Sequence, residues 1–99
     1  MKEIELKLDD SGMGAFVIEE GEETIAEMAI SISGNNLTVY HTEVSDKLKG
    51  QGVASELLLK MVEYAREQNL NVIPRCSYVN AQFKRHADQY SDICNENTP

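Results

Sequence analysis

The segment of this chain that points most clearly to chemistry contains two closely spaced glycines, Gly50 and Gly52, in the sequence KLKGQGVA from Lys47 to Ala54. Glycine lets the backbone turn tightly and approach a ligand, because no Cβ stands in the way. A stretch with helical spacing follows, and the first turn of a helix presents unpaired N–H groups and the positive end of the helix dipole. Together these features favour binding of an anion such as a pyrophosphate.

The segment differs from two common phosphate-binding fingerprints. It lacks the G-x-x-x-x-G-K-[ST] spacing of a P-loop, and Ser55 stands where a dinucleotide-binding motif has its third glycine. The neighbouring Lys47 and Lys49 favour a negatively charged ligand. A strand-to-helix turn that binds nothing is the alternative interpretation.

Two side chains in one expected strand are suited to moving protons. Histidine is a residue type suited to proton transfer in water, and Glu43 follows His41 two residues later, so either could be a general base, or Glu43 could orient His41. Strict alternation predicts that both lie on the face shared with Leu37 and Val39. A partly buried, hydrogen-bonded histidine without a chemical role is the alternative.

The elements that must position these residues begin with strands. Apolar residues alternate with polar ones from Ile4 to Leu8 and from Thr24 to Ser33, which is typical of half-buried strands. We also expect strands over 15–19 and 37–44. Turns rich in Gly, Asn, Asp and Glu separate these segments, so they are predicted to form an antiparallel meander.

The periodicity then changes to that of a helix. Apolar residues recur at intervals of three and four from Val53 to Gln68, which predicts an amphipathic helix. A short buried strand is expected over 71–75, and the order strand, helix, strand predicts that it pairs in parallel with 37–44. We expect a second helix from Tyr78 to Ala87 and a frayed tail from Ser91.

These elements describe a mixed α/β fold in one small domain. The chain has 99 residues, and we expect residues 1–94 to form the domain and 95–99 a disordered tail. Two cysteines, Cys76 and Cys94, are too few for a secreted disulfide scaffold, which favours free thiols in the cytoplasm. No apolar run approaches the roughly 18–20 residues of a membrane span.

The net charge of −8 indicates which kinds of molecule the protein can bind. A pI near 4.6 argues against nucleic acid and against an anionic membrane surface, because both require a basic footprint. Residues 1–46 hold eleven acidic and two basic side chains, so this half would attract a cationic ligand. Acidic turns that only keep the protein soluble are the alternative.

The segment from Lys49 to Ala54 resembles the [Q/R]-x-x-G-x-[G/A] acetyl-CoA loop of the GNAT superfamily of N-acetyltransferases. Gly52 and Ala54 match this motif, while Lys49 replaces the usual Gln or Arg and still supplies a donor. The order of meander, loop, long helix, short strand and second helix is similar too. The sequences HTEV at 41–44 and PRC at 74–76 resemble those of a small single-domain subgroup of the superfamily.

The resemblance implies that acetyl-CoA is the co-substrate and that no metal is needed. Its pyrophosphate would lie on the loop amides, and its pantetheine arm would pair with the backbone of Glu43 and Val44. The thioester would enter a splay between the parallel strands 37–44 and 71–75. The implied cofactor-binding residues are Glu43, Val44, Lys49, Gly50, Gln51, Gly52, Val53, Ala54, Asn80, Phe83 and Lys84.

The resemblance also brings Cys76 to the end of the strand where the thioester would arrive. Cys76 would either protonate the leaving thiolate or attack acetyl-CoA to form an acetyl-cysteine, with His41 helping to generate the thiolate. A small buried cysteine is the alternative. Many members use a tyrosine acid in an N-x-x-A-x-x-x-Y pattern, which fails when counted from Asn80. Tyr78 comes too early and Tyr90 too late for that pattern.

These features predict an acetyl-CoA-dependent N-acetyltransferase that acts on an amine, which the acidic half suggests is cationic. The alternatives are a CoA-binding module without activity and a small interaction protein. Most relatives carry helices between the first two strands, where this chain has only a turn from Asp9 to Gly12. The acceptor site is therefore expected to be open or completed by a partner. We expect a monomer or a weak dimer.

Overall fold

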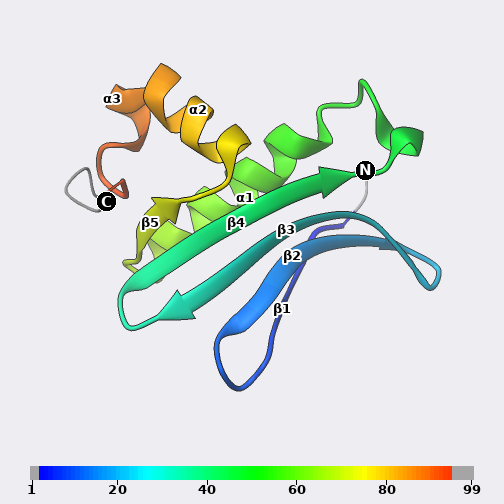
Figure 1. The fold of residues 1–99 in the computed structure, drawn as a ribbon, viewed down its shortest axis with the longest axis horizontal. Helices are drawn as coiled ribbons and strands as arrows, with labels where there is room; N and C mark the ends of the chain where they lie inside the picture. The colour runs from blue at the N-terminus through cyan, green and yellow to red at the C-terminus, as the bar shows by residue number, and fades with distance from the viewer. Residues whose placement is uncertain (1–2, 95–99) are drawn as a thin grey trace.

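Five strands form one sheet in the order β1-β2-β3-β4-β5 in a computed structural model that describes residues 3–94 (Figure 1). The first three pairings are antiparallel, and β4 pairs with β5 in parallel. The predicted fold class, a meander followed by a parallel β-α-β unit, is confirmed. The elements are β1 (Glu5–Leu8), β2 (Met13–Glu20), β3 (Glu23–Ser33), β4 (Asn36–Val44), a 3₁₀ turn (Asp46–Leu48), α1 (Val53–Glu67), β5 (Asn71–Pro74), α2 (Ser77–Arg85) and α3 (Ala87–Tyr90).

Helix α1 covers one face of the sheet, and it lies behind β4 and β5 in Figure 1. Its buried side chains follow the helical spacing expected from the sequence: Val53, Leu57, Leu58, Met61, Val62 and Ala65. Asn69, with a φ of 56°, follows the end of the helix, as its sequence position predicts. In the described part of the chain, no helix lies over the other face of β1, β2 and β3 (Figure 1). None of the described helices has the length and apolar character of a membrane span.

A β-bulge interrupts the pairing of β3 with β4. Ala29 lies opposite His41 and Ile30 lies opposite Val39, so Tyr40 is an extra residue in β4. An extra residue breaks the alternation of a strand and turns the following side chains to the other face. Before the bulge, the odd-numbered side chains of β4 are buried. After it, the odd-numbered side chains are exposed.

The bulge corrects the predicted position of the two proton-transfer candidates. Leu37 and Val39 are fully buried, whereas His41 and Glu43 are exposed. The prediction that all four share one face is wrong, because it assumed strict alternation through Tyr40. His41 and Glu43 do share a face with each other, and it is the face that α1 leaves open.

The C-terminal region is also more ordered than predicted. The expected helix over 78–87 is divided at His86 into α2 and α3. The expectation of a frayed tail from Ser91 is wrong up to Cys94, because Ile93 is buried and its carbonyl accepts a 2.7 Å hydrogen bond from the N–H of Val72. The predicted tail over 95–99 lies outside the described residues.

Candidate functional site

The parallel strands β4 and β5 separate halfway along β4. Their last register pair joins Val39 to Pro74, and the amides of Arg75 and Cys76 both donate to the Val39 carbonyl, at 3.0 and 2.9 Å. Beyond this point β4 continues to Val44 while the chain turns into α2. The splay expected between the two strands is therefore present, and it leaves the second half of β4 with an open edge.

The backbone groups at this open edge belong to alternate residues. The Ser45 N–H donates to the Ile25 carbonyl at 2.8 Å, so the odd-numbered residues at this end of β4 face β3. Alternation turns the N–H and C=O groups of Thr42 and Val44 to the open edge. Val44 thus has the orientation that the pantetheine pairing requires, whereas the backbone of Glu43 faces β3.

Both glycines of the loop adopt the left-handed conformation. The φ angles are 80° for Gly50 and 71° for Gly52, and Gly52 is the N-cap of α1. A Cβ added at either position would meet no atom within 4 Å. Glycine is thus favoured here by backbone conformation, and space lies open above the loop.

Some amides of the loop are used internally and others are available. The Lys49 N–H donates to the Asp46 carbonyl, and the Gln51 N–H donates to the Leu48 carbonyl. Within the motif segment 49–54, the N–H groups that have no hydrogen-bond partner among residues 3–94 are those of Gly50, Gly52, Val53 and Ala54. The structure therefore supplies four of the six amides that the family motif implies.

A cavity of about 390 Å³ connects these parts. It is lined by the end of β4, the glycine loop, the first turn of α1 and Tyr78 at the start of α2. Partial burial is the main cause that raises the pKa of Tyr78, and the neighbouring Ser55 acts in the opposite direction with a smaller effect. Sequence reasoning set Tyr78 aside because it did not fit the spacing of the family pattern. Its position two residues after Cys76 was the signal that it lies at the splay.

Cys76 lies at the splay itself. Its side chain is only 4% exposed, and Thr42 Oγ1 is 3.5 Å from Cys76 Sγ. Cys76 is also the N-cap residue of α2, so it stands at the positively polarised end of that helix. The thiol is thus held between the free edge of β4 and the start of α2, next to the cavity residue Tyr78.

A GCN5-related N-acetyltransferase family model matches residues 15–93 of the chain. This chain belongs to that family. The NMR structure of a GCN5-like protein from Staphylococcus aureus is similar over 99% of this chain and 96% of that one, with 33% identity and a TM-score of 0.68. Nourseothricin acetyltransferase is similar over 65% of this chain and 40% of its own, with 29% identity and a TM-score of 0.51.

Curated relatives extend the comparison to a longer protein. Rat N-acetyltransferase 8B is 34% identical over 67 residues, which is 62% of this chain and 30% of the relative. The chain thus spans less than a third of that protein's length. Members of this GNAT family transfer acyl groups, and acetyl-CoA is their typical co-substrate. The resemblance to the GNAT superfamily noted in the sequence is confirmed.

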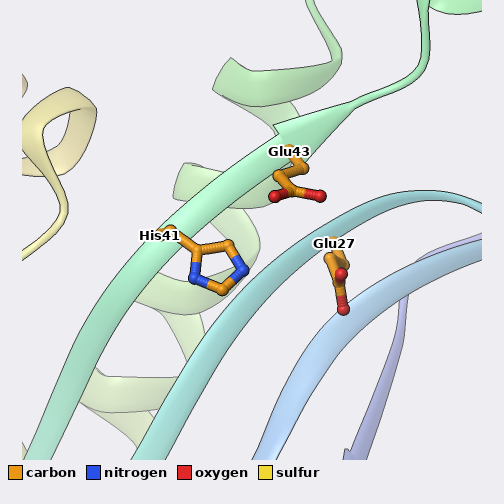
Figure 2. A group of neighbouring side chains, drawn as sticks. All are labelled: Glu27, His41 and Glu43. Atoms are coloured by element: carbon orange, nitrogen blue, oxygen red, sulfur yellow. The ribbon is translucent and has the colours of Figure 1, made fainter.

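The proton-transfer candidates of this GNAT chain lie on the open face of the sheet. Figure 2 shows His41 and Glu43 beside Glu27 of β3, with α1 behind them. Thr42, the residue between His41 and Glu43, contacts Cys76. Because side chains alternate along a strand, His41 and Cys76 lie on opposite sides of β4. The structure therefore does not bring His41 to the Cys76 thiol.

The predicted residues of α2 lie in three different environments. Asn80 Nδ2 donates to the Pro74 carbonyl at 3.1 Å, which ties α2 to the end of β5. Phe83 is buried, and its ring lies 4.7 Å from that of Tyr90, so it is a core residue. Lys84 is exposed and lines a separate hollow at the α2–α3 junction. None of the three lines the cavity at the loop.

Proposed function

We propose that this chain is an acetyl-CoA-dependent N-acetyltransferase that modifies a primary amine in the cytoplasm. The observation that carries the proposal is the path from the glycine loop to Cys76. Free amides begin this path, the 390 Å³ cavity continues it, and the open edge of β4 leads to the splay. A pyrophosphate, an extended amide-containing arm and a thioester follow one another in the same order along acetyl-CoA.

The first part of the path suits the pyrophosphate. Four amides at the loop and the first turn of α1 are available as donors, and the dipole of α1 favours negative charge there. Lys49 is exposed beside the loop. Lys47 is less available, because its ammonium already pairs with Glu23 at 2.9 Å.

The second part suits the pantetheine arm and the thioester. The arm adds to the free edge of β4 as an extra strand, with Val44 as its first partner. Thr42 is the next edge residue, and its side chain contacts Cys76. Its N–H would stabilise the negative charge that develops on the thioester oxygen during attack.

Cys76 has two roles open to it in the transfer step. As an acid, it gives its proton to the departing CoA thiolate while the amine attacks the acetyl carbonyl. As a nucleophile, its sulfur attacks that carbonyl, the CoA thiolate leaves and takes up a proton, and the amine then displaces the cysteine. The raised pKa of Tyr78 keeps that hydroxyl protonated, so Tyr78 is a second proton donor at the splay.

The acceptor amine would approach from the open face of the sheet. Glu43 and His41 lie there and are the candidate bases that remove the proton of the ammonium group. The absence of helices over β1, β2 and β3 in the described residues leaves room for an exposed lysine or a chain N-terminus. The carboxylate of Glu43 on this face favours a cationic acceptor.

Titration calorimetry with acetyl-CoA, followed by a thiol-release assay against a panel of amines, tests this function. We expect acetyl-CoA to bind and at least one primary amine to give steady release of CoA. Binding without release for any amine, including lysine peptides and free N-termini, would favour the non-catalytic module. Absence of binding would refute the proposal.

A further inference from the structure

Three side chains with metal-binding atoms meet on the open face of the sheet. They are Glu27 of β3 and His41 and Glu43 of β4, and their candidate ligand atoms all lie within 4.8 Å of one another. Figure 2 shows the three projecting from neighbouring strands on the side away from α1. The group combines one imidazole with two carboxylates, so it is a mixed donor set.

The register of the sheet creates this arrangement. Glu27 lies directly opposite Glu43, and Ala29 lies opposite His41, so the small alanine side chain leaves room beside the imidazole. The bulge at Tyr40 turns both residues of β4 outward. Without the extra residue, the alternation of β4 would turn these side chains toward the buried face.

The two carboxylates lie directly opposite each other on neighbouring strands. Like charges directly opposite each other on neighbouring strands destabilise a sheet. Among residues 3–94, the ion pairs involve other side chains, and neither Glu27 nor Glu43 takes part in one. A bound cation would supply the missing positive charge.

A hollow beside the carboxylates gives access to this group. It has a volume of about 230 Å³ and is lined by Glu27, Glu43 and the polar residues Thr24 and Ser45, among others. This space accommodates an ion together with water ligands. Three protein ligands plus a water in the fourth position is the arrangement of catalytic zinc sites.

We propose that Glu27, His41 and Glu43 form a binding site for a divalent transition-metal ion of the zinc class. Imidazole is a preferred ligand of zinc, copper, iron and nickel, whereas magnesium and calcium prefer sites made of oxygen atoms alone. The site departs from the sequence-based expectation of no metal. That expectation covered both the site residues and the cofactor, and the proposed transfer chemistry assigns no step to this ion.

Metal binding has a consequence for the proposed reaction. His41 and Glu43 are also the candidate bases for the acceptor amine, and a metal ion would occupy the lone pairs that they use. Zinc is therefore expected to inhibit acetyl transfer. This consequence rests on the proposed function, while metal binding itself does not.

Calorimetry with Zn²⁺ and absorption spectroscopy with Co²⁺ test the site directly. We expect one ion per chain and a cobalt spectrum typical of nitrogen and oxygen ligands. Loss of a group that only orients a metal ligand weakens metal binding about 10- to 100-fold. Glu27 is a ligand itself, so Glu27→Gln should weaken zinc binding about tenfold or more. Glu5→Gln is the matched control, since Glu5 lies in the same cross-strand row, two strands from Glu27 and exposed. It should bind zinc as the wild type does.

The same variants separate this proposal from the enzymatic one. Glu27 is not among the residues assigned to transfer, so Glu27→Gln should keep its acetyl-transfer activity in the absence of zinc and resist inhibition by zinc. Equal zinc affinity in the wild type and Glu27→Gln would overturn the metal site, as would thiolate-to-cobalt charge-transfer bands that disappear in Cys76→Ala or Cys94→Ala. A failure of acetyl transfer itself would leave the calorimetric result unaffected.

Discussion

Replacement of Gly52 by alanine tests the glycine loop against a matched position elsewhere in the chain. Gly52 and Gly34 have φ angles of 71° and 58°, and a Cβ at either position would meet no atom within 4 Å. The left-handed conformation costs a non-glycine residue about 1–2 kcal/mol. Gly52→Ala and Gly34→Ala should therefore lower the free energy of unfolding by similar amounts.

Their effects on acetyl-CoA binding should differ, because only Gly52 lines the loop cavity. A methyl group there enters the cavity, and relaxation of the strained φ angle turns an available amide away from the phosphates. The loss of one hydrogen bond to a charged group costs about 1.5–3 kcal/mol, which corresponds to about 10- to 150-fold weaker binding. Gly34 lies in the turn between β3 and β4, so Gly34→Ala should keep the wild-type affinity.

Urea unfolding gives the stability of both variants, and titration calorimetry gives their affinity for acetyl-CoA. Equal losses of stability combined with a selective loss of affinity in Gly52→Ala would support the loop as the phosphate site. If Gly52→Ala binds acetyl-CoA as tightly as Gly34→Ala does, the reasoning about the loop is refuted.

Three further predictions concern the splay and the C-terminal region. Cys76→Ala should lower the rate of acetyl transfer about 100-fold or more with little change in acetyl-CoA affinity. Cys94→Ala is the control and should remain active. Parallel losses of activity and affinity in Cys76→Ala would contradict a catalytic role for Cys76. Thr42→Val keeps the side-chain shape but loses the hydroxyl 3.5 Å from the thiol, so transfer should fall about 2- to 12-fold, and an unchanged rate would show that this contact is unimportant. Arg66 lowers the pKa of Asp92 below its ordinary value of 3.8, so the ion pair stabilises the fold at neutral pH and this effect disappears as pH falls through the lowered pKa. In urea unfolding, Asp92→Asn should be less stable than the wild type at neutral pH and should match it in acid, and a difference independent of pH would contradict the assignment.

Much of the fold could be predicted because each element has a regular period. The alternation over 24–33 and the three- and four-residue spacing over 53–68 both correspond to the observed β3 and α1. The order strand, helix, strand was sufficient to predict the parallel pairing of β4 with β5. These features depend on patterns spread over many residues, so single exceptions do not hide them.

The remaining features depend on single residues in their tertiary context. No residue type in β4 indicated that Tyr40 would be an extra residue, yet this bulge decides on which face His41 and Glu43 lie. Ile93 lies in a polar stretch of sequence, yet it packs into the core, and its carbonyl accepts a hydrogen bond from the N–H of Val72, which is distant in sequence. Tyr78 was set aside on spacing, although the turn after β5 brings it to the cavity.

An NMR titration of ¹⁵N-labelled protein with acetyl-CoA tests the central claim most directly, because it observes the amides themselves. We predict that acetyl-CoA shifts the amide signals of residues 50–54 more than those of the other loops. The signals of Thr42 and Val44 at the open edge should shift together with them. The amides of Gly21 and Gly34, which occupy other turns, should stay unchanged. Stationary signals at 50–54 in the presence of saturating acetyl-CoA would contradict the account.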